Sequence, residues 1–404
     1  MTSATEEAVG RFSRGDFILV AVLISRFAFG YQIQTVASIG PELIRVFGLD
    51  LATLGALIGA YMASGLFVAV PLGLLARRFG ERPVLGTGLA IMTLGAIGAG
   101  LATGPLGIGI GRAVAGIGAV SMVVIQGKIL ADWFPGKRLI GAISWSVCAW
   151  PVGVGLGQIV QAPLAQAMGW RAAFLSGAVL SALALAAFLA FYRPAPGAVQ
   201  VPRAFSLPGR WECVLVIIGG AVWGTFNAGY IGFVAYVPTL LTERGESLGV
   251  IAAVALLATW GNVPATLVGG RLAARHGGTR VFLFGMVALS IAVAGIGLGG
   301  WPVAWALLFG LLGAVHPGVI ITRGTLSTKP ENRVVGMGMF YSVYYIGGTV
   351  FPALCGRVGD LTRSTLGGPT GALLAASALS LLAIPLFLLH RSLGRRTGIV
   401  PPGV

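Results

Sequence analysis

Long apolar runs recur along the whole chain, and they limit what it can fold into more than any other feature. A run of about 20 apolar residues is long enough to cross the hydrocarbon core of a membrane as a helix. Such runs take up most of the 404 residues, of which 56% are hydrophobic and only 10% are charged. Because a helix satisfies its own backbone hydrogen bonds in lipid, the sequence predicts an all-α integral membrane protein.

Charged residues and Gly/Pro clusters divide the chain into twelve predicted transmembrane helices. These spans begin near residues 17, 51, 84, 106, 139, 171, 212, 248, 281, 303, 334 and 370. Because the number of spans is even, we expect both termini on the same side of the membrane.

The basic residues predict which side that is. Of the 27 lysines and arginines, 18 lie in segments on the same side of the membrane as the termini. Five lie in loops on the opposite side, and four lie within the predicted spans. The five are Arg45, Arg171, Arg244, Arg357 and Arg363, and the four are Arg26, Arg112, Lys128 and Arg323. Cytoplasmic loops carry the excess of basic residues, so we expect cytoplasmic termini in the cell inner membrane. Anionic lipid headgroups, rather than nucleic acid, then account for the net charge of +15.

The chain also consists of two related halves, separated by the polar stretch 192–212. Pro41 and Gly80 recur as Pro238 and Gly277, and "PLGLLARRFGERPV" parallels "VGGRLAARHGGTRV". Internal repeats of this kind are common in transporters. We therefore predict two pseudo-symmetric six-helix bundles, at 16–192 and 212–391. A cytoplasmic linker at 193–211 joins them, and cytoplasmic tails occupy 1–15 and 392–404.

Short motifs add a family resemblance. They are "GLLARRFGER" (73–82), its weaker copy "GRLAARHGGTR" (270–280), "GRAVAGIG" (111–118), "DWFPGKR" (132–138) and "GWRAAF" (169–174). In this order and spacing the chain resembles the major facilitator superfamily over nearly its whole length. The resemblance implies a monomeric secondary transporter that works by alternating access around a central cavity. That cavity would be lined mainly by spans 1, 4, 7 and 10.

The same resemblance indicates residues for coupling or gating. Arg112 belongs to the fourth-span motif, and a structural role is the alternative for it. Arg77 and Arg78 follow the second span, where Arg77 replaces the usual acidic residue of the family. The fifth span carries the Trp150 and Pro151 pair without the full glycine pattern of drug antiporters.

The charges within the spans predict the substrate. All twelve acidic residues fall in tails, loops or span ends, whereas Arg26 lies close to the middle of the first span. A buried cation in a membrane is costly, and a guanidinium matches a planar carboxylate. We therefore predict a small anionic substrate, an organic carboxylate, bound by Arg26. Gln34 lies on the same helical face. The alternative is that Arg26 binds backbone carbonyls and locks helices together.

Lys128 and Arg323 occupy equivalent positions in the two halves, at an offset of 195 residues. We predict that they face each other across the substrate pathway. Alternatively, Lys128 pairs with Asp132 one turn later, and either side chain extends to the membrane surface.

Aromatic residues predict the opposite wall of the site. Trp223, Asn227 and Tyr230 share one helical face, and Tyr341 lies in the eleventh span beside Tyr344 and Tyr345. Core packing is the alternative. His316 precedes Pro317 in the tenth span, and since histidine titrates near neutral pH it would carry a coupling proton, unless it is a packing residue.

Several functions remain open. Transport would be anion exchange or proton-coupled, and drug efflux, inorganic anion transport of the nitrate or cyanate type, and a non-transporting membrane sensor are alternatives. We expect no enzyme activity, because the sequence has no catalytic constellation. No cofactor or metal is expected, since Cys148, Cys213 and Cys355 lack metal-binding spacing. The expected partners are the substrate, a proton or counter-anion, and lipids.

Overall fold

The computed structural model describes residues 13–134, 137–195, 208–329 and 332–400, which form helices and no strand. The N-terminal half contains α1 (Arg14–Ser38), α2 (Gly40–Phe47), α3 (Leu51–Phe79), α4 (Glu81–Leu101), α5 (Pro105–Trp133), α6 (Lys137–Met168) and α7 (Trp170–Phe191). The C-terminal half contains α8 (Arg210–Glu243), α9 (Leu248–Trp260), α10 (Asn262–His276), α11 (Gly278–Leu298), α12 (Pro302–Leu307), the π-helical turn η1 (Leu308–Leu312), α13 (Pro317–Leu326), α14 (Arg333–Leu361), α15 (Gly368–Leu381) and α16 (Ala383–Thr397).

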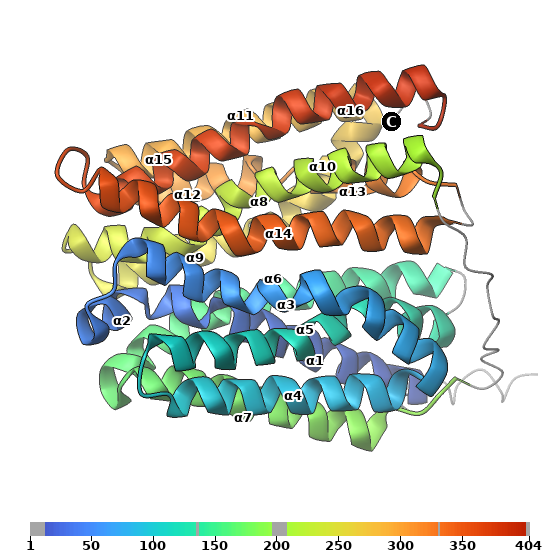
Figure 1. Ribbon diagram of the computed structural model, residues 1–404, viewed down its shortest axis with the longest axis horizontal. Coiled ribbons are helices and arrows are strands. Elements are labelled where there is room, and N and C mark those ends of the chain that lie inside the picture. Colours follow the sequence, from blue (N-terminus) through green and yellow to red (C-terminus); the bar gives the residue numbers. More distant parts are fainter. Residues whose placement is uncertain (1–12, 135–136, 196–207, 330–331, 401–404) are drawn as a thin grey trace, which may run out of the picture.

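The helices agree with the predicted spans. Within the described residues, ten stretches are long and apolar enough to cross a membrane. The fifth and eleventh predicted spans correspond to α6 and α14, of 32 and 29 residues, which lie along the same axis as the others (Figure 1). The fold is thus all-α and consistent with twelve spans.

The sequence predicts a distortion of the tenth span at Pro317 and Gly318, and the structure confirms it, whereas the breaks in the eighth and twelfth spans were not predicted. The eighth span is divided into α9 and α10, the tenth into α12, η1 and α13, and the twelfth into α15 and α16. Pro317 begins α13, and because proline has no backbone N–H it suits a helix start. All three divided spans lie in the C-terminal half, so the two halves differ in where their spans are interrupted.

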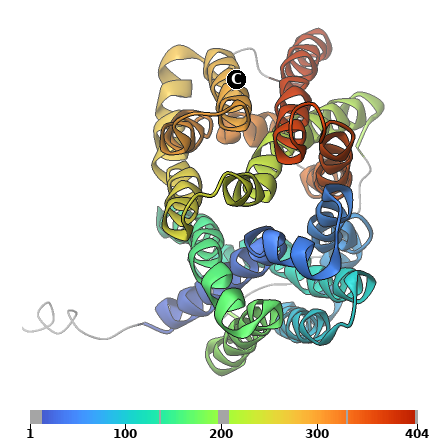
Figure 2. The ribbon, with the colours of Figure 1, turned by 90° about the vertical axis from the view of Figure 1, so that its left-hand side faces the viewer.

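The two halves form two groups of helices, seen along the helix axes in Figure 2. Within the N-terminal half α1 packs on α6, and α4 packs on α5 and α7; within the C-terminal half α8 packs on α14 and α15. The groups meet where α3 packs on α14 and α6 packs on α9. Most of the predicted linker and N-terminal tail lie outside the described residues, and α16 continues past the predicted boundary at 391.

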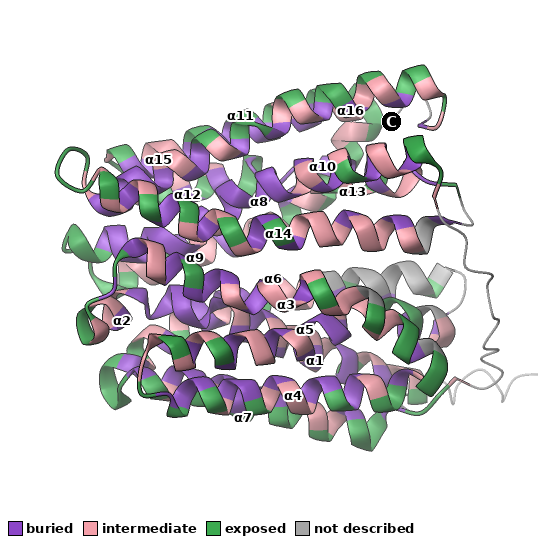
Figure 3. Ribbon diagram, in the orientation of Figure 1, coloured by how far each residue is buried: buried purple, intermediate pink, exposed green. Residues whose placement is uncertain are grey.

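Large apolar side chains are exposed on the outer surface of the bundle. Leu106 is 79% exposed and Phe67 is 73% exposed, and many further leucines, valines and phenylalanines are more than a third exposed. Buried residues line the faces between helices, as Figure 3 shows. A surface of this kind suits contact with lipid chains rather than water, in agreement with a multi-pass membrane protein.

The two ends of the bundle differ. We call the end that carries α2 the α2 end, and the end at which α7 stops and α8 begins the linker end (Figure 1). At the α2 end Asp360 of α14 accepts hydrogen bonds from the backbone N–H groups of Leu51 (3.0 Å) and Ala52 (2.9 Å), which begin α3. Tyr236 of α8 donates to the carbonyl oxygen of Leu51 in the N-terminal half (3.3 Å). These contacts close the α2 end between the halves.

Candidate substrate site

Arg26 lies halfway along α1, and its guanidinium lacks the bonds that a buried cation usually makes. Its Nε and Nη1 atoms are buried and have no hydrogen-bond partner among the described residues. In that part of the chain the ion pairs are Arg45 with Glu42, Lys128 with Glu81 and Asp132, and Arg363 with Asp360, so none includes Arg26. The predicted alternative, in which backbone carbonyls hold Arg26, is not observed for these two nitrogens.

Arg26 lies beside an aromatic group to which both halves contribute. Its guanidinium carbon lies 5.7 Å from the ring centre of Phe29, within the range of a cation–π interaction. Tyr345 of α14 lines the same small space as Phe29, and its ring neighbours Tyr344, which in turn neighbours Tyr341. The placement of Tyr341 beside Arg26 stays a prediction.

Further rings connect this group across the two halves. Trp150 of α6 packs between Phe29 (6.4 Å between ring centres) and Tyr230 (6.3 Å). Trp223 packs against Tyr344 at 6.1 Å. We call this set the central aromatic cluster: Phe29, Trp150, Trp223, Tyr230, Tyr341, Tyr344 and Tyr345. Trp150 and Phe29 were missed as site residues, although Phe29 is one turn from Arg26 and Trp150 stands beside Pro151.

A small hollow lies beside the cluster. It has room for about one water molecule and is lined mainly by apolar side chains, among them Phe29, Ile33, Met62, Val120 and Tyr345. Since Phe29 neighbours Arg26, the arrangement places an apolar space next to a cation. Sites for small molecules typically combine an apolar lining with a few polar groups that fix orientation.

Two predicted polar residues of the site have other surroundings. Gln34 is buried two turns from Arg26 and packs against Gly157 of α6, while Asn227 donates to the carbonyl oxygen of Trp223 (2.7 Å) in its own helix. Gly30 leaves no room for a ligand, because it packs directly on the carbonyl group of Trp150. Neither amide joins the group around Arg26.

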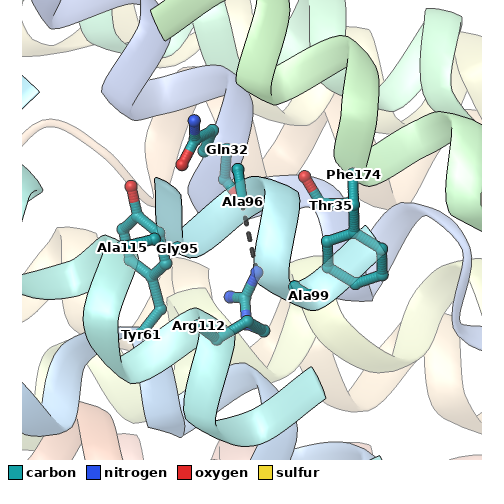
Figure 4. A pocket seen from close by; sticks show the side chains of 9 residues that line it. All are labelled: Gln32, Thr35, Tyr61, Gly95, Ala96, Ala99, Arg112, Ala115 and Phe174. Atoms are coloured by element: carbon teal, nitrogen blue, oxygen red, sulfur yellow. Dashed lines mark hydrogen bonds between the residues drawn. The ribbon is translucent and has the colours of Figure 1, made fainter. Parts of the chain in front are cut away.

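Arg112 of α5 is a structural residue by its contacts. It is 2% exposed and donates to the carbonyl oxygens of Leu57 (2.7 Å), Gln32 (3.3 Å), Ile33 (3.2 Å) and Ile58 (3.4 Å). Its guanidinium also lies 4.9 Å from the ring centre of Tyr61. Figure 4 shows Arg112 between α1, α3 and α4, next to a cavity of about 210 Å³. The geometry supports the structural alternative over a coupling role.

The contacts of Lys128 favour the predicted alternative, pairing with Asp132, over a place opposite Arg323 on the substrate pathway. Lys128 is 44% exposed and pairs with Glu81 and with Asp132 (2.7 Å), which holds it inside the N-terminal half at the linker end. Arg323 is buried in the C-terminal half, where it donates to His390 (3.4 Å) and stacks on Phe387 (5.1 Å). Lys128 and Arg323 occupy equivalent positions in the two halves, but these contacts of each side chain are with residues of its own half.

The other predicted coupling residues differ in their surroundings. His316 is fully buried in the C-terminal half, with Phe226 and Phe282 packed edge-on against its ring at 4.7 and 5.5 Å. Neither of its ring nitrogens has a hydrogen-bond partner among the described residues. Arg78 is exposed at the end of α3 and lies over Phe79 (5.3 Å), and the side chain of Arg77 lies outside the described part of the structure.

Fold and site together define a class of protein: a multi-pass helical membrane protein of two halves, closed at one end, with a cation and aromatic rings near its centre. Residues 22–352 match the model of the Major Facilitator Superfamily, so the chain belongs to that family of membrane transporters. This confirms the resemblance found in the motifs.

Known relatives are transport and resistance proteins rather than enzymes. The chain is 24% identical to the 4-hydroxybenzoate transporter PcaK of Pseudomonas aeruginosa over 61% of its own length and 63% of that protein. It is 27% identical to the quinolone resistance protein NorB of Staphylococcus aureus over 43% of its own length and 38% of that protein. The chain thus spans less than two thirds of the length of these relatives.

Solved structures share the fold. A bacterial homologue of the human lysosomal transporter Spinster, in an inward-facing and occupied conformation, aligns with a TM-score of 0.75 and 16% identity, covering 95% of this chain and 98% of that one. The nucleoside transporter NupG aligns with a TM-score of 0.76 and 14% identity, covering 93% of this chain and 99% of that one. These identities are too low to indicate a shared substrate.

Proposed function

We propose that the protein is a secondary transporter of a small organic carboxylate. The observation that carries the proposal is the guanidinium of Arg26, whose buried Nε and Nη1 atoms have no hydrogen-bond partner and no carboxylate within ion-pair distance among the described residues. A buried donor left unbonded costs about 1–3 kcal/mol, and more when it is charged. An anionic substrate removes that cost each time it binds.

The central aromatic cluster favours an apolar body on this anion. Phe29 and Tyr345 line a small apolar space, and Trp150, which contacts Phe29, packs against Tyr230 of the opposite half. The likeness to a 4-hydroxybenzoate transporter agrees with a ring-bearing carboxylate. The substrate class that best matches these surroundings is an aromatic or similarly planar monocarboxylate.

The cycle would proceed by alternating access. With the α2 end closed by Asp360 and Tyr236, the substrate enters and leaves through the linker end. The excess of basic residues at the linker end supports cytoplasmic termini in the inner membrane, so this state would face the cytoplasm. The substrate bridges the halves, and a monomer completes the cycle by exchange with a second anion or by movement of a proton with the substrate.

Thermal stabilisation of the purified protein tests the substrate class. A ligand at 100 times its dissociation constant adds about 2.7 kcal/mol of stability. We expect benzoate-like carboxylates to raise the melting temperature, and labelled benzoate to show counterflow in liposomes loaded with the unlabelled acid. Stabilisation by cationic or neutral compounds alone, with none by carboxylates, would overturn the proposal.

Export of amphipathic compounds is the second candidate. It is favoured by the number of aromatic side chains at the centre and by the likeness to a quinolone resistance protein. The described residues place no carboxylate beside Arg26 to attract a cationic compound. Counterflow of a lipophilic cation in the same liposomes separates this function from the first.

A further inference from the structure

Trp150, a member of the central aromatic cluster, resembles Arg26 in having a buried hydrogen-bond donor without a partner among the described residues. Its indole Nε1 is buried and has no hydrogen-bond partner among the described residues. In soluble and membrane proteins a buried indole N–H usually has a partner, because leaving it unbonded is costly. The ring is held in place by Phe29 at 6.4 Å and Tyr230 at 6.3 Å.

The unsatisfied groups of Arg26 and Trp150 have the same chemical character. A guanidinium and an indole N–H donate hydrogen bonds and accept none. Phe29 contacts both side chains, with the guanidinium of Arg26 at 5.7 Å from its ring centre and the ring of Trp150 at 6.4 Å, so a single aromatic ring connects the two donors. A molecule that satisfies both must present an acceptor at each of two separated points.

We infer that Trp150 is a specificity-determining residue, whose indole N–H donates to a second acceptor on the substrate while Arg26 binds the carboxylate. The inference rests on the proposed function and sharpens it. The preferred substrate is a ring carboxylate that carries an oxygen acceptor away from its carboxylate. A ring acid without that oxygen binds through Arg26 alone and is held more weakly.

Three ligands test this in the wild-type protein without any substitution. Benzoate has only the carboxylate, 4-hydroxybenzoate adds an oxygen, and 4-methylbenzoate matches its shape without an acceptor. One neutral hydrogen bond contributes about 0.5–1.5 kcal/mol. We expect 4-hydroxybenzoate to bind about five- to tenfold more tightly than 4-methylbenzoate in calorimetric titrations. Equal affinities would overturn the inference while leaving the proposed function intact.

Trp150→Phe then identifies the donor. The substitution keeps an aromatic ring between Phe29 and Tyr230 but removes the N–H. We expect the preference for 4-hydroxybenzoate over 4-methylbenzoate to disappear, because 4-hydroxybenzoate alone loses a hydrogen bond. Trp305→Phe is the matched control, because the indole of Trp305 already donates to the carbonyl oxygen of Gly299 (3.2 Å) far from the cluster.

The outcomes separate the two ideas. An equal loss of affinity for all three acids would show that Trp150 acts only by packing, and an unchanged preference would show that another group is the donor. Both results reject the role of Trp150. If none of the acids binds to the wild-type protein, the proposed function fails, and the inference fails with it.

Discussion

Arg26 and Arg112 are both arginines among the helices of the N-terminal half, and their guanidinium groups have opposite surroundings. Arg112 donates to four backbone carbonyls of α1 and α3 and stacks on Tyr61. Two nitrogens of Arg26 have no such acceptor, and its neighbours are aromatic rings. The protein can therefore satisfy a buried guanidinium with its own backbone, and of these two arginines it does so for Arg112. That contrast separates a residue that holds helices together from one suited to bind an anion.

The largest effect should follow Arg112→Leu. The substitution leaves the carbonyl groups of Leu57, Gln32, Ile33 and Ile58 without their donor, and each bond to a charged group contributes about 1.5–3 kcal/mol. We expect a loss of at least about 3 kcal/mol of stability, seen as a much lower melting temperature in detergent. Arg112→Lys should recover part of it, since the charge remains. A stable Arg112→Leu protein would mean that these four bonds contribute little.

Arg26→Gln should show the reverse pattern. Without ligand the melting temperature should stay the same or rise, because the change removes a buried charge that has no internal counter-ion. Carboxylate affinity should fall about 100-fold, or 2.7 kcal/mol, in titrations of the purified protein. A stability loss as large as that of Arg112→Leu would place Arg26 in the structural class and remove the basis of the proposed function.

The sequence predicted the fold because its signals there are local. Apolar runs, loop charges and the repeated motifs each depend on a few neighbouring residues, and they anticipated the all-α fold and the family. Pro317 and Gly318 predict the distortion of the tenth span, whereas the break in the eighth span was missed because it depends on contacts between helices. Gly261 at the break in the eighth span packs on Gly310 within the π-helical turn of the tenth.

The site was predicted only in part. Position along the span predicts Arg26 at mid-depth, and the structure has it halfway along α1 and over the ring of Phe29, while its role and the nearness of the α14 tyrosines stay predictions. The internal repeat predicts that Lys128 and Arg323 face each other across the substrate pathway. Their contacts do not follow from the repeat, because matching backbone positions do not determine which partner a flexible side chain binds. Trp150 was not predicted as a site residue, because the sequence does not show whether its indole N–H is buried and without a hydrogen-bond partner.

Arg26→Lys sharpens the comparison by keeping the charge and changing its shape. An ammonium cannot donate the two parallel hydrogen bonds that a guanidinium offers to a carboxylate. We expect about a tenfold loss of benzoate affinity, intermediate between wild type and Arg26→Gln, with stability unchanged. Titration calorimetry with benzoate on the wild-type, Arg26→Lys and Arg26→Gln proteins gives the order of their affinities. If Arg26→Lys binds as well as wild type, the site recognises charge alone, and the planar geometry of the guanidinium contributes nothing.

The smallest effect is expected for Lys128→Ala, which asks whether a cation that has its own counter-ions also serves the substrate. Lys128 is 44% exposed and already paired with Glu81 and Asp132. Exposed pairs typically contribute at most about 1 kcal/mol, so the melting temperature should fall slightly and carboxylate affinity should change less than twofold. Added salt should diminish even the stability difference, since it screens charges at the surface. A drop in affinity of more than fivefold would show that Lys128 leaves its acidic partners for the substrate. Binding would then depend on total positive charge rather than on the one guanidinium without a partner.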